Sequence, residues 1–397
     1  MINYESIQTI TFKLLDNIEK ANYQGYDPYD LLNSKINFKV LGPKVCFYLS
    51  QIHKRNPLDI RKFLLIPKSV NPKGLGLLLE AYSNLYKLYK SDDILNKMHL
   101  LFERLLAIHS KGFHGYCWGL DFNYANRYEL LPSYSPSIVV TSFVCNGIFE
   151  YYLVTNNSRA IEVLKSSCDF ALKDLYITKD DDKICFSYTT TKRDITFNAN
   201  ALAAELFSKV YYITKDENYK NIAKAAIDFN IKYQKNDGSW NYQLFNNGNE
   251  KKQIDFHQGF ILNSLFNFIR YTSINDGRYL ESLQIGANFY FNRQFSQKGW
   301  SYWRIPKKWP IDIHNQAQGI ITFTELYKLN HEFYSFAQRI AEWTIENMLG
   351  RNGLFYYRIS KFHKNKIPYL RWNQIWMLLA LSKLLLIKKK MDDKYDS

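Results

Sequence analysis

Six apolar segments recur along the chain, each preceded by polar or aromatic residues. They begin near Pro72, Pro136, Asn198, His257, His314 and Arg371. The steps between them are 64, 62, 59, 57 and 57 residues. Each segment is rich in Gly, Ala and Leu on most faces of a helix, and a helix that is apolar nearly all round is a buried one. This internal repeat therefore predicts six inner helices.

A second set of helices is predicted between the inner ones. Short polar turns with Ser, Asn or Asp, which are favoured N-cap residues, end the first five inner segments. They lie at 90–93, 155–158, 214–217, 273–276 and 329–332. Amphipathic spacing follows each turn, as at Ile222, Ala225, Ile227 and Ile231, which indicates one wet face. With residues 3–20 as the first outer helix, the pattern predicts an all-α (α/α)6 toroid, one domain over 1–397.

Longer loops connect each outer helix to the next inner helix. They lie at 112–119, 183–188, 236–242, 297–303 and 352–357, and in four of the five a Gly precedes aromatic residues. This pattern predicts small β-hairpins or tight turns. Because all five loops make the same kind of connection, they must share one face of the ring, and we expect the functional site there. Residues 21–71 interrupt the repeat and are expected to cover the mouth of that face.

An Asp-x-His pattern occurs twice, before the fourth and fifth inner helices. Asp255 precedes His257, and Asp312 precedes His314. Two carboxylates facing a cleft suit glycosyl chemistry, as general acid with base or nucleophile, and the histidines could bind hydroxyls or exchange protons. The alternative is that each Asp only caps its helix and each His only anchors a loop. The spacing is not a helical zinc motif, so we expect no metal, and with no GxGxxG we expect no cofactor.

Other candidates come from loops that mix aromatic and polar side chains. An aromatic ring beside polar groups suits a sugar, and Arg near a helix N-terminus suits an acidic group. The alternatives are aromatic loops tucked against the ring, arginines paired with the aspartates, and a plain turn at 25–30. Asp121 is a third candidate carboxylate, and the substrate-binding candidates are Trp118, Tyr124, Arg127, Arg193, Trp240, Trp303, Arg371, Trp372, Tyr26 and Asp27.

Composition narrows the class of partner. The net charge is +15 and the aromatic share is 17%, which fits an acidic polysaccharide or an anionic membrane, while no nucleic-acid-binding pattern is present. Five cysteines without a CxxC pair indicate reduced thiols. The sequence starts without a signal peptide, and its most apolar segment, 375–387, is too short to span a bilayer. We therefore expect a cytoplasmic protein that binds no nucleic acid.

Five segments also carry a resemblance to known proteins. They read GYDPYD (25–30), GYCWGLDF (115–122), NDGSWNY (236–242), PIDIHNQAQ (310–318) and KIPYLRWNQIWM (366–377). Together with the alternating hairpins, they resemble the six-hairpin glycosidase superfamily, and within it the VpsJ-like proteins of surface-polysaccharide gene clusters. Some of those proteins carry the label delta-aminolevulinic acid dehydratase, a TIM-barrel enzyme whose βα units this sequence lacks. The resemblance implies the toroid and a polysaccharide context, without a reaction.

Two functions are compatible with these features. The first is an enzyme of surface-polysaccharide biosynthesis: a hydrolase using Asp255 and Asp312, or a lyase or epimerase using His and Tyr as proton carriers, on an acidic oligosaccharide. The second is a non-catalytic glycan-binding or scaffold component that contacts other assembly proteins. Carboxylates across an open pocket would favour hydrolysis, and carboxylates bonded to their own helix N–H groups would favour the second. On the hydrolase hypothesis, Asp312→Asn abolishes turnover and leaves the fold intact.

Overall fold

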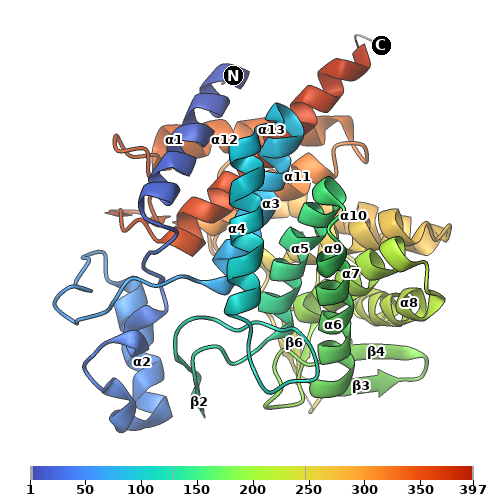
Figure 1. Ribbon diagram of the computed structural model, residues 1–397, viewed down its shortest axis with the longest axis horizontal. Coiled ribbons are helices and arrows are strands. Elements are labelled where there is room, and N and C mark those ends of the chain that lie inside the picture. Colours follow the sequence, from blue (N-terminus) through green and yellow to red (C-terminus); the bar gives the residue numbers. More distant parts are fainter. Residues whose placement is uncertain (1–2, 128, 246, 396–397) are drawn as a thin grey trace.

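The computed structural model describes residues 3–127, 129–245 and 247–395. The inner helices are α3 (Pro72–Tyr89), α5 (Ile138–Thr155), α7 (Phe197–Thr214), α9 (His257–Thr272), α11 (Ile313–Glu325) and α13 (Trp376–Tyr395). The outer helices are α1 (Tyr4–Lys20), α4 (Asp92–Ala107), α6 (Ser158–Asp174), α8 (Glu217–Lys232), α10 (Gly277–Arg293) and α12 (His331–Met348). Each inner helix packs against the next, and α13 packs back on α3. The predicted (α/α)6 toroid is confirmed, with both termini at the same end of the molecule (Figure 1).

The inner helices are buried on every side. All residues of α7 from Phe197 to Val210 are buried, whereas α8 buries only one face. Helices α3 and α5 approach closely at two glycines, because a Cβ atom on Gly147 would lie 2.1 Å from the carbonyl oxygen of Gly76. Helix α5 is also long and apolar enough to cross a membrane by length and composition, but 72% of that stretch is buried inside the ring.

Amide side chains at one repeated position hold the loops to the inner helices. Gln258 accepts a hydrogen bond from the backbone N–H of Trp240 (2.9 Å) and donates to its carbonyl (2.8 Å). Gln374 makes the same pair of bonds to Phe355. Gln316 and Asn200 also bind their loops, but each accepts from one loop residue and donates to the carbonyl two positions before it. The four amides stand 58 residues apart. These amides therefore fix each loop to the inner helix that follows it.

Two tryptophans of these loops point into the ring wall. The indole N–H of Trp118 donates to the carbonyl of Leu105 (2.9 Å), and that of Trp240 donates to Asn230 (2.8 Å). Both side chains are essentially unexposed. The expectation that Trp118 and Trp240 stack on sugar rings is therefore corrected: their only polar atom is used to fasten a loop to an outer helix.

Short antiparallel strands pair within and between the loops on one face of the ring. Hairpins are formed by β1 (Tyr124–Ala125) with β2 (Leu130–Leu131), and by β3 (Ile177–Asp180) with β4 (Lys183–Phe186). Strand β5 (Ile195–Thr196) pairs with β6 (Gln243–Leu244), which pairs with β7 (Glu250–Lys251). Strand β8 (Ile311–Asp312) pairs with β9 (Arg358–Ile359), which pairs with β10 (Lys364–Asn365). The two three-stranded sheets each join loops of neighbouring repeats, so the loop face is continuous.

The inserted segment folds against this face (Figure 1, lower left). It contains the short helices η1 (Asp30–Asn33) and η2 (Phe38–Leu41) and the helix α2 (Gly42–Arg55). A buried ion pair between Arg61 and Asp30 (2.9 Å) and a hydrogen bond from Arg61 to Tyr369 (3.0 Å) fix it to the ring. Just before α13, a π-helical turn, η3 (Leu370–Ile375), brings Arg371 and Trp372 to the same place.

Candidate active site

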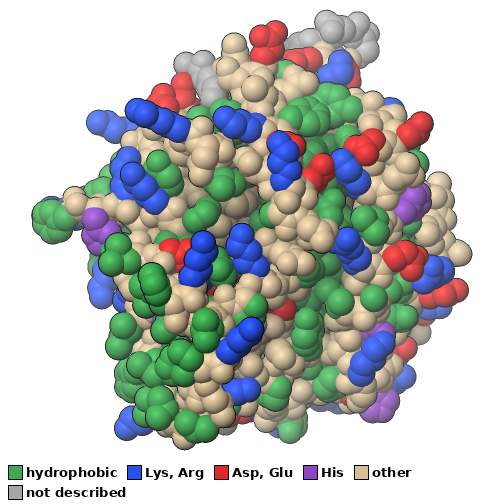
Figure 2. All heavy atoms as spheres, turned by 60° about the vertical axis from the view of Figure 1, so that its left-hand side comes forward, with side chains coloured by type: hydrophobic (Ala, Val, Ile, Leu, Met, Phe, Trp, Pro, Cys, Tyr) green, Lys and Arg blue, Asp and Glu red, His purple; other side chains and the backbone are tan. Residues whose placement is uncertain are grey.

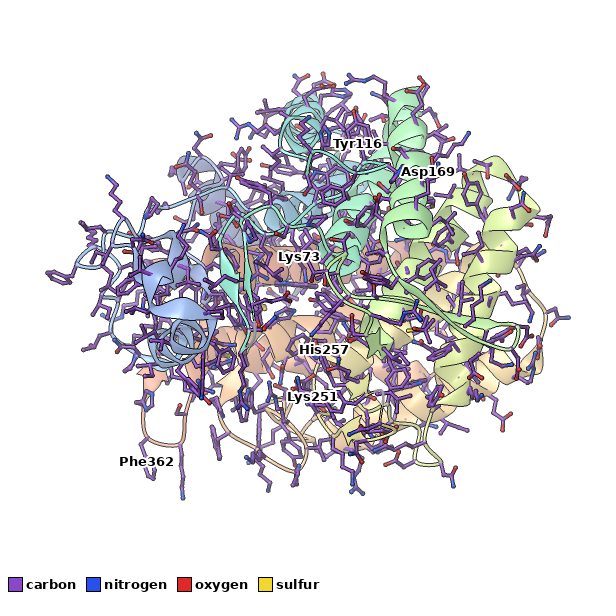
Figure 3. The ribbon with its side chains drawn as sticks, turned by 90° about the horizontal axis from the view of Figure 1, so that it is seen from below. Lys73, Tyr116, Asp169, Lys251, His257 and Phe362 are labelled. Carbon is purple, nitrogen blue, oxygen red and sulfur yellow. The ribbon has the colours of Figure 1, made fainter. Side chains whose placement is uncertain are left out.

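A cavity of about 720 Å³ opens among the long loops and the N-terminal ends of the inner helices. Figure 3 looks into the ring from below, with Lys73 and His257 near its centre and Tyr116, Asp169 and Phe362 outside it. Nine predicted site residues line this cavity: Tyr124, Arg127, Asp255, His257, Trp303, Asp312, His314, Arg371 and Trp372. The inserted segment contributes Tyr29, Phe47, Gln51 and Lys54 to its wall.

His257 forms a dyad with the aspartate two residues before it. Its Nδ1 lies 2.5 Å from an oxygen of Asp255, which leaves Nε2 as the ring nitrogen for a ligand. Asp255 also accepts a hydrogen bond from Gln253 (2.8 Å) and lies 3.4 Å from Arg304. Burial alone would raise the pKa of Asp255, but His257 and Arg304 hold it below its usual value. A carboxylate bound to one ring nitrogen fixes the tautomer and orientation of the imidazole.

His314 lies on the cavity wall in a cage of aromatic rings. Its ring stacks on Phe256 at 4.3 Å between centroids and contacts Trp372 at 4.5 Å and Trp376 at 4.4 Å. Neither ring nitrogen has a hydrogen-bond partner among the described residues. Burial, followed by the charge of Lys73, lowers the pKa of His314 well below its usual value. A buried polar group without a partner is costly, so the ring nitrogens of this neutral imidazole are available to form a hydrogen bond with a ligand.

The two histidines are close neighbours. Phe256 is in ring contact with both, at 4.2 Å from His257 and 4.3 Å from His314. All three side chains line the cavity. The site thus offers two imidazoles, one oriented by a carboxylate and one held neutral by burial.

Asp312, like Asp255, is engaged by protein donors at both oxygens, but the ring of its own histidine is not one of them. One oxygen accepts from the backbone N–H of His314 (3.0 Å) and the indole N–H of Trp372 (2.9 Å). The other oxygen pairs with Arg358 at 2.6 Å. Asp312 is therefore an N-cap and a buried ion-pair partner, and its expected role as a catalytic acid or nucleophile has no free oxygen to act through.

This pairing changes the result expected for Asp312→Asn. Asparagine preserves the cap but leaves Arg358, which is only 12% exposed, without its counter-charge. Breaking a buried pair on one side costs about 3–5 kcal/mol, so thermal unfolding should move to lower temperature. The double variant Asp312→Asn with Arg358→Gln should recover part of that loss. An Asp312→Asn protein with wild-type stability and no turnover would instead restore the catalytic role.

Lys73 was not among the residues expected at the site. It is the second residue of α3, is only 6% exposed, and lies on the cavity wall. Its ammonium nitrogen lies 4.0 Å from the ring centroid of Phe143 and 5.3 Å from that of Trp376. Burial, followed by the charge of Arg371, lowers the pKa of Lys73 well below its usual value, although Asp27 opposes this. The position of Lys73 at the start of an inner helix was the available sequence signal.

Further residues of the cavity wall come from the inserted segment and the long loops, whose positions the helical repeat does not predict. Lys54 of α2 donates to the hydroxyl of Tyr29, and burial lowers the pKa of Lys54 well below its usual value. Lys251 of β7 lies 4.4 Å from the ring of Tyr242. Arg304 and Arg358 complete this wall. In all, eight Lys or Arg side chains and four Asp or Glu side chains line the cavity.

Besides Trp118 and Trp240, four predicted residues lie away from the cavity. Asp121 accepts hydrogen bonds from Ser69 and Asn71 outside the cavity, and burial raises its pKa to about 6. Asp27 forms a buried ion pair with Arg371 (2.7 Å), and Tyr26 lies in the same group beneath the floor. Arg193 is exposed, over the ring of Tyr176. These positions correct their expected roles: Asp121 and Asp27 brace the floor, and Arg193 faces solvent.

No protein-family model and no curated protein matches this sequence. Solved structures do match. The cellobiose 2-epimerase of Bacillus thermoamylovorans is 16% identical, covers 81% of this chain and 88% of its own, and gives a TM-score of 0.64. A D-mannose isomerase is 12% identical, with 81% and 87% covered and a TM-score of 0.63. The α-1,6-mannanase GH76A of Salegentibacter is 15% identical, with 81% and 90% covered and a TM-score of 0.63. It was solved with α-1,6-mannotriose as an inactive variant in which two consecutive aspartates are replaced.

The closed ring of helical hairpins, with one large cavity among its long loops, defines an (α/α)6 toroid protein. This is the fold of the six-hairpin glycosidase superfamily. At these identities the likeness is one of fold, and function has to be argued from the cavity itself. Within the described residues, no group of three or more His, Cys, Asp or Glu side chains is arranged to hold a metal ion.

Proposed function

We propose that this chain is a carbohydrate epimerase or isomerase that moves a proton on the carbon next to a sugar carbonyl. The observation that carries the proposal is the pair of imidazoles, His257 and His314, which flank Phe256 in one cavity and each keep a ring nitrogen for the ligand. Imidazole is the most frequent general acid and base in enzymes. The cellobiose 2-epimerase and D-mannose isomerase among the similar structures support the same reaction class.

Hydrolysis is less well supported by the carboxylates. Asp255 and Asp312 are 1% and 2% exposed, and both are engaged with protein donors. A glycosidase needs one carboxyl group to protonate the leaving oxygen and a second to attack or activate water. Consecutive aspartates occur in this chain at 92–93, 180–182 and 392–393, and none of these residues lines the cavity. The similarity to the mannanase therefore extends to the fold and not to an aspartate pair in the cavity.

Each histidine then has a distinct task on the open-chain sugar. His314, held neutral, accepts the proton from the carbon next to the carbonyl. The electron pair of that C–H bond forms a C=C bond, and the π pair of the carbonyl moves onto its oxygen, which gives an enediolate. Lys73 donates a hydrogen bond to that oxygen, which stabilises the developing negative charge. His257 returns a proton through Nε2. Return to the opposite face of the same carbon gives the epimer, and return to the neighbouring carbon, with transfer of the hydroxyl proton between the two enediolate oxygens, gives the isomer. The imidazoles exchange tasks in the reverse reaction.

The wall of the cavity favours an acidic sugar. Among the described residues, basic side chains outnumber acidic ones by eight to four, and Asp255 and Asp312 are already paired with Arg304 and Arg358. Lys251 makes no ion pair within the described residues, and burial lowers its pKa together with the charge of Arg304. A uronic acid in an oligosaccharide would supply the missing negative charge. We keep surface-polysaccharide biosynthesis in the cytoplasm as the setting of this proposal, with five buried free cysteines in agreement.

Product analysis separates this proposal from its competitors. The protein is incubated with cellobiose, D-mannose, D-glucuronate and an oligosaccharide containing glucuronate, and the products are identified by NMR. The proposal predicts conversion to an epimer or to the matching ketose, without new reducing ends. Release of reducing ends would identify a glycosidase, and saturable binding of these sugars without any conversion would favour the glycan-binding alternative.

A further inference from the structure

The inserted segment carries an apolar surface that no part of the described chain covers. Among the residues that the structure describes, nine of the twenty exposed large hydrophobic side chains lie between residues 36 and 65. They are Ile36, Val40, Leu41, Val45, Tyr48, Ile52, Leu58, Phe63 and Leu65, here called the insertion patch. Figure 2 shows hydrophobic side chains gathered at its lower left, with Lys and Arg side chains beside them. Single exposed hydrophobic residues are ordinary, but a contiguous group of this kind marks an interaction surface.

Helix α2 explains how this surface arises. Cys46, Ser50 and His53 form its buried stripe. Residues 47, 51 and 54 form a second stripe that lines the cavity. The third stripe is residues 45, 48 and 52, which are 45%, 45% and 67% exposed. A surface helix normally turns polar residues to water, so the apolar outer stripe of α2 needs an occupant.

The charge around the patch identifies the chemistry of that occupant. Residues 34–68 contain eight Lys or Arg and one acidic residue, Asp59, so this short segment carries +7 of the net charge of +15. Six of the basic side chains are exposed: Lys35, Lys39, Lys44, Arg55, Lys62 and Lys68. Asp59 is itself within 3.4 Å of Arg61. An apolar stripe ringed by cations is the pattern of helices that lie in the interface of an anionic bilayer.

We propose that the insertion patch docks this protein on an anionic membrane surface, with α2 lying in the headgroup region. Lysines near a lipid surface attract anionic headgroups, and the apolar side chains enter the boundary below them. A second copy of the chain is a poor occupant, because it would bring another strongly positive patch against the first. Since α2 also lines the cavity, docking brings the mouth to the lipid surface. If the proposed function holds, a saccharide carried on a lipid would reach the histidines without leaving the membrane.

Vesicle flotation tests this proposal on the full chain. The probes are phosphatidylcholine vesicles and vesicles in which phosphatidylglycerol replaces part of that lipid. We expect the wild type to float with the anionic vesicles, to remain in solution with the neutral ones, and to be released by high salt. Replacing three lysines, as in Lys39→Gln, Lys44→Gln and Lys62→Gln, should lower the partition coefficient on the order of 100-fold.

A matched pair of variants separates the patch from general stickiness. The patch variant carries Val40→Ser, Ile52→Ser and Phe63→Ser, and the control carries Leu100→Ser, Leu280→Ser and Phe362→Ser, which are exposed residues elsewhere. The patch variant should lose at least tenfold in binding and the control should bind as the wild type does, with both unfolding at the wild-type temperature. Equal loss in both variants, no flotation of the wild type, or a dimer that only the patch variant disrupts would each overturn the proposal. None of these readouts depends on turnover.

Discussion

Replacing His314 by glutamine is expected to lower kcat on the order of 10³-fold with the fold intact. Removal of a general acid or base usually costs a factor in this range, and glutamine has a similar length but cannot carry the proton. His314 packs among aromatic rings, and its ring nitrogens make no hydrogen bond with the described residues. The substitution therefore breaks no hydrogen bond. Steady-state kinetics on the substrate found by product analysis gives the comparison, with His363→Gln on the exposed loop between β9 and β10 as control.

The pH profile of the wild type gives a second readout for the same residue. The pKa of His314 is lowered well below its usual value, with burial as the main cause. A base of this kind keeps its neutral form as the pH falls below the ordinary histidine pKa of about 6.5. The acid limb of kcat/KM should therefore lie below pH 6.5. An acid limb above that value, or a His314→Gln variant with unchanged kcat, would remove His314 from the reaction.

Replacing Lys73 by methionine is expected to stabilise the protein while lowering turnover. Lys73 is buried without an ion-pair partner among the described residues, so desolvation destabilises its charged form in the folded state. Methionine fills the same space among Phe143 and Trp376 without that cost. We expect a gain of about 1–2 kcal/mol in the free energy of unfolding at neutral pH, the range typical of relieving a functional site.

The pH dependence of that gain follows from the sign of the shift. The folded pKa of Lys73 is lowered, so the unfolded chain binds the proton more tightly and wild-type stability rises with pH up to the ordinary lysine value near 10.4. The advantage of Lys73→Met should therefore shrink as the pH approaches that value. Thermal unfolding across this range measures it, with Lys251→Met, at an exposed position, as the control. A destabilised Lys73→Met protein at neutral pH would show that the ammonium supports the fold.

The fold was predictable because each repeat carries the same pattern for one inner and one outer helix in its own sequence. All-round apolar helices recur six times, with polar N-cap turns after the first five, and the structure has inner helices within a few residues of every predicted start. The side of the ring that carries the cavity followed from loop length alone. Sequence could not assign the loop tryptophans, because Trp118 and Trp240 look the same whether the ring meets a sugar or a helix carbonyl, and only the packing decides.

The Asp-x-His repeat was the strongest sequence signal and also the most misleading. Counted from the loop-anchoring amides, Asp255 stands three residues before Gln258, and Asp312 stands four before Gln316. Both aspartates accept a hydrogen bond from the backbone N–H of the histidine two residues on, but only Asp255 also binds the ring of that histidine. No sequence motif contains Lys73, Lys54 or Arg358. These residues line the same cavity only because the ring closes.

The proposed epimerase or isomerase reaction requires transfer of a proton between a sugar carbon and two histidines. The most direct measurement is deuterium incorporation from D₂O at the carbon next to the carbonyl, followed by NMR for the wild type, His257→Gln and His314→Gln. We predict exchange in the wild type, with little or none in either variant. Conversion of the sugar without any deuterium at that carbon, or exchange that persists in both variants, would contradict the account.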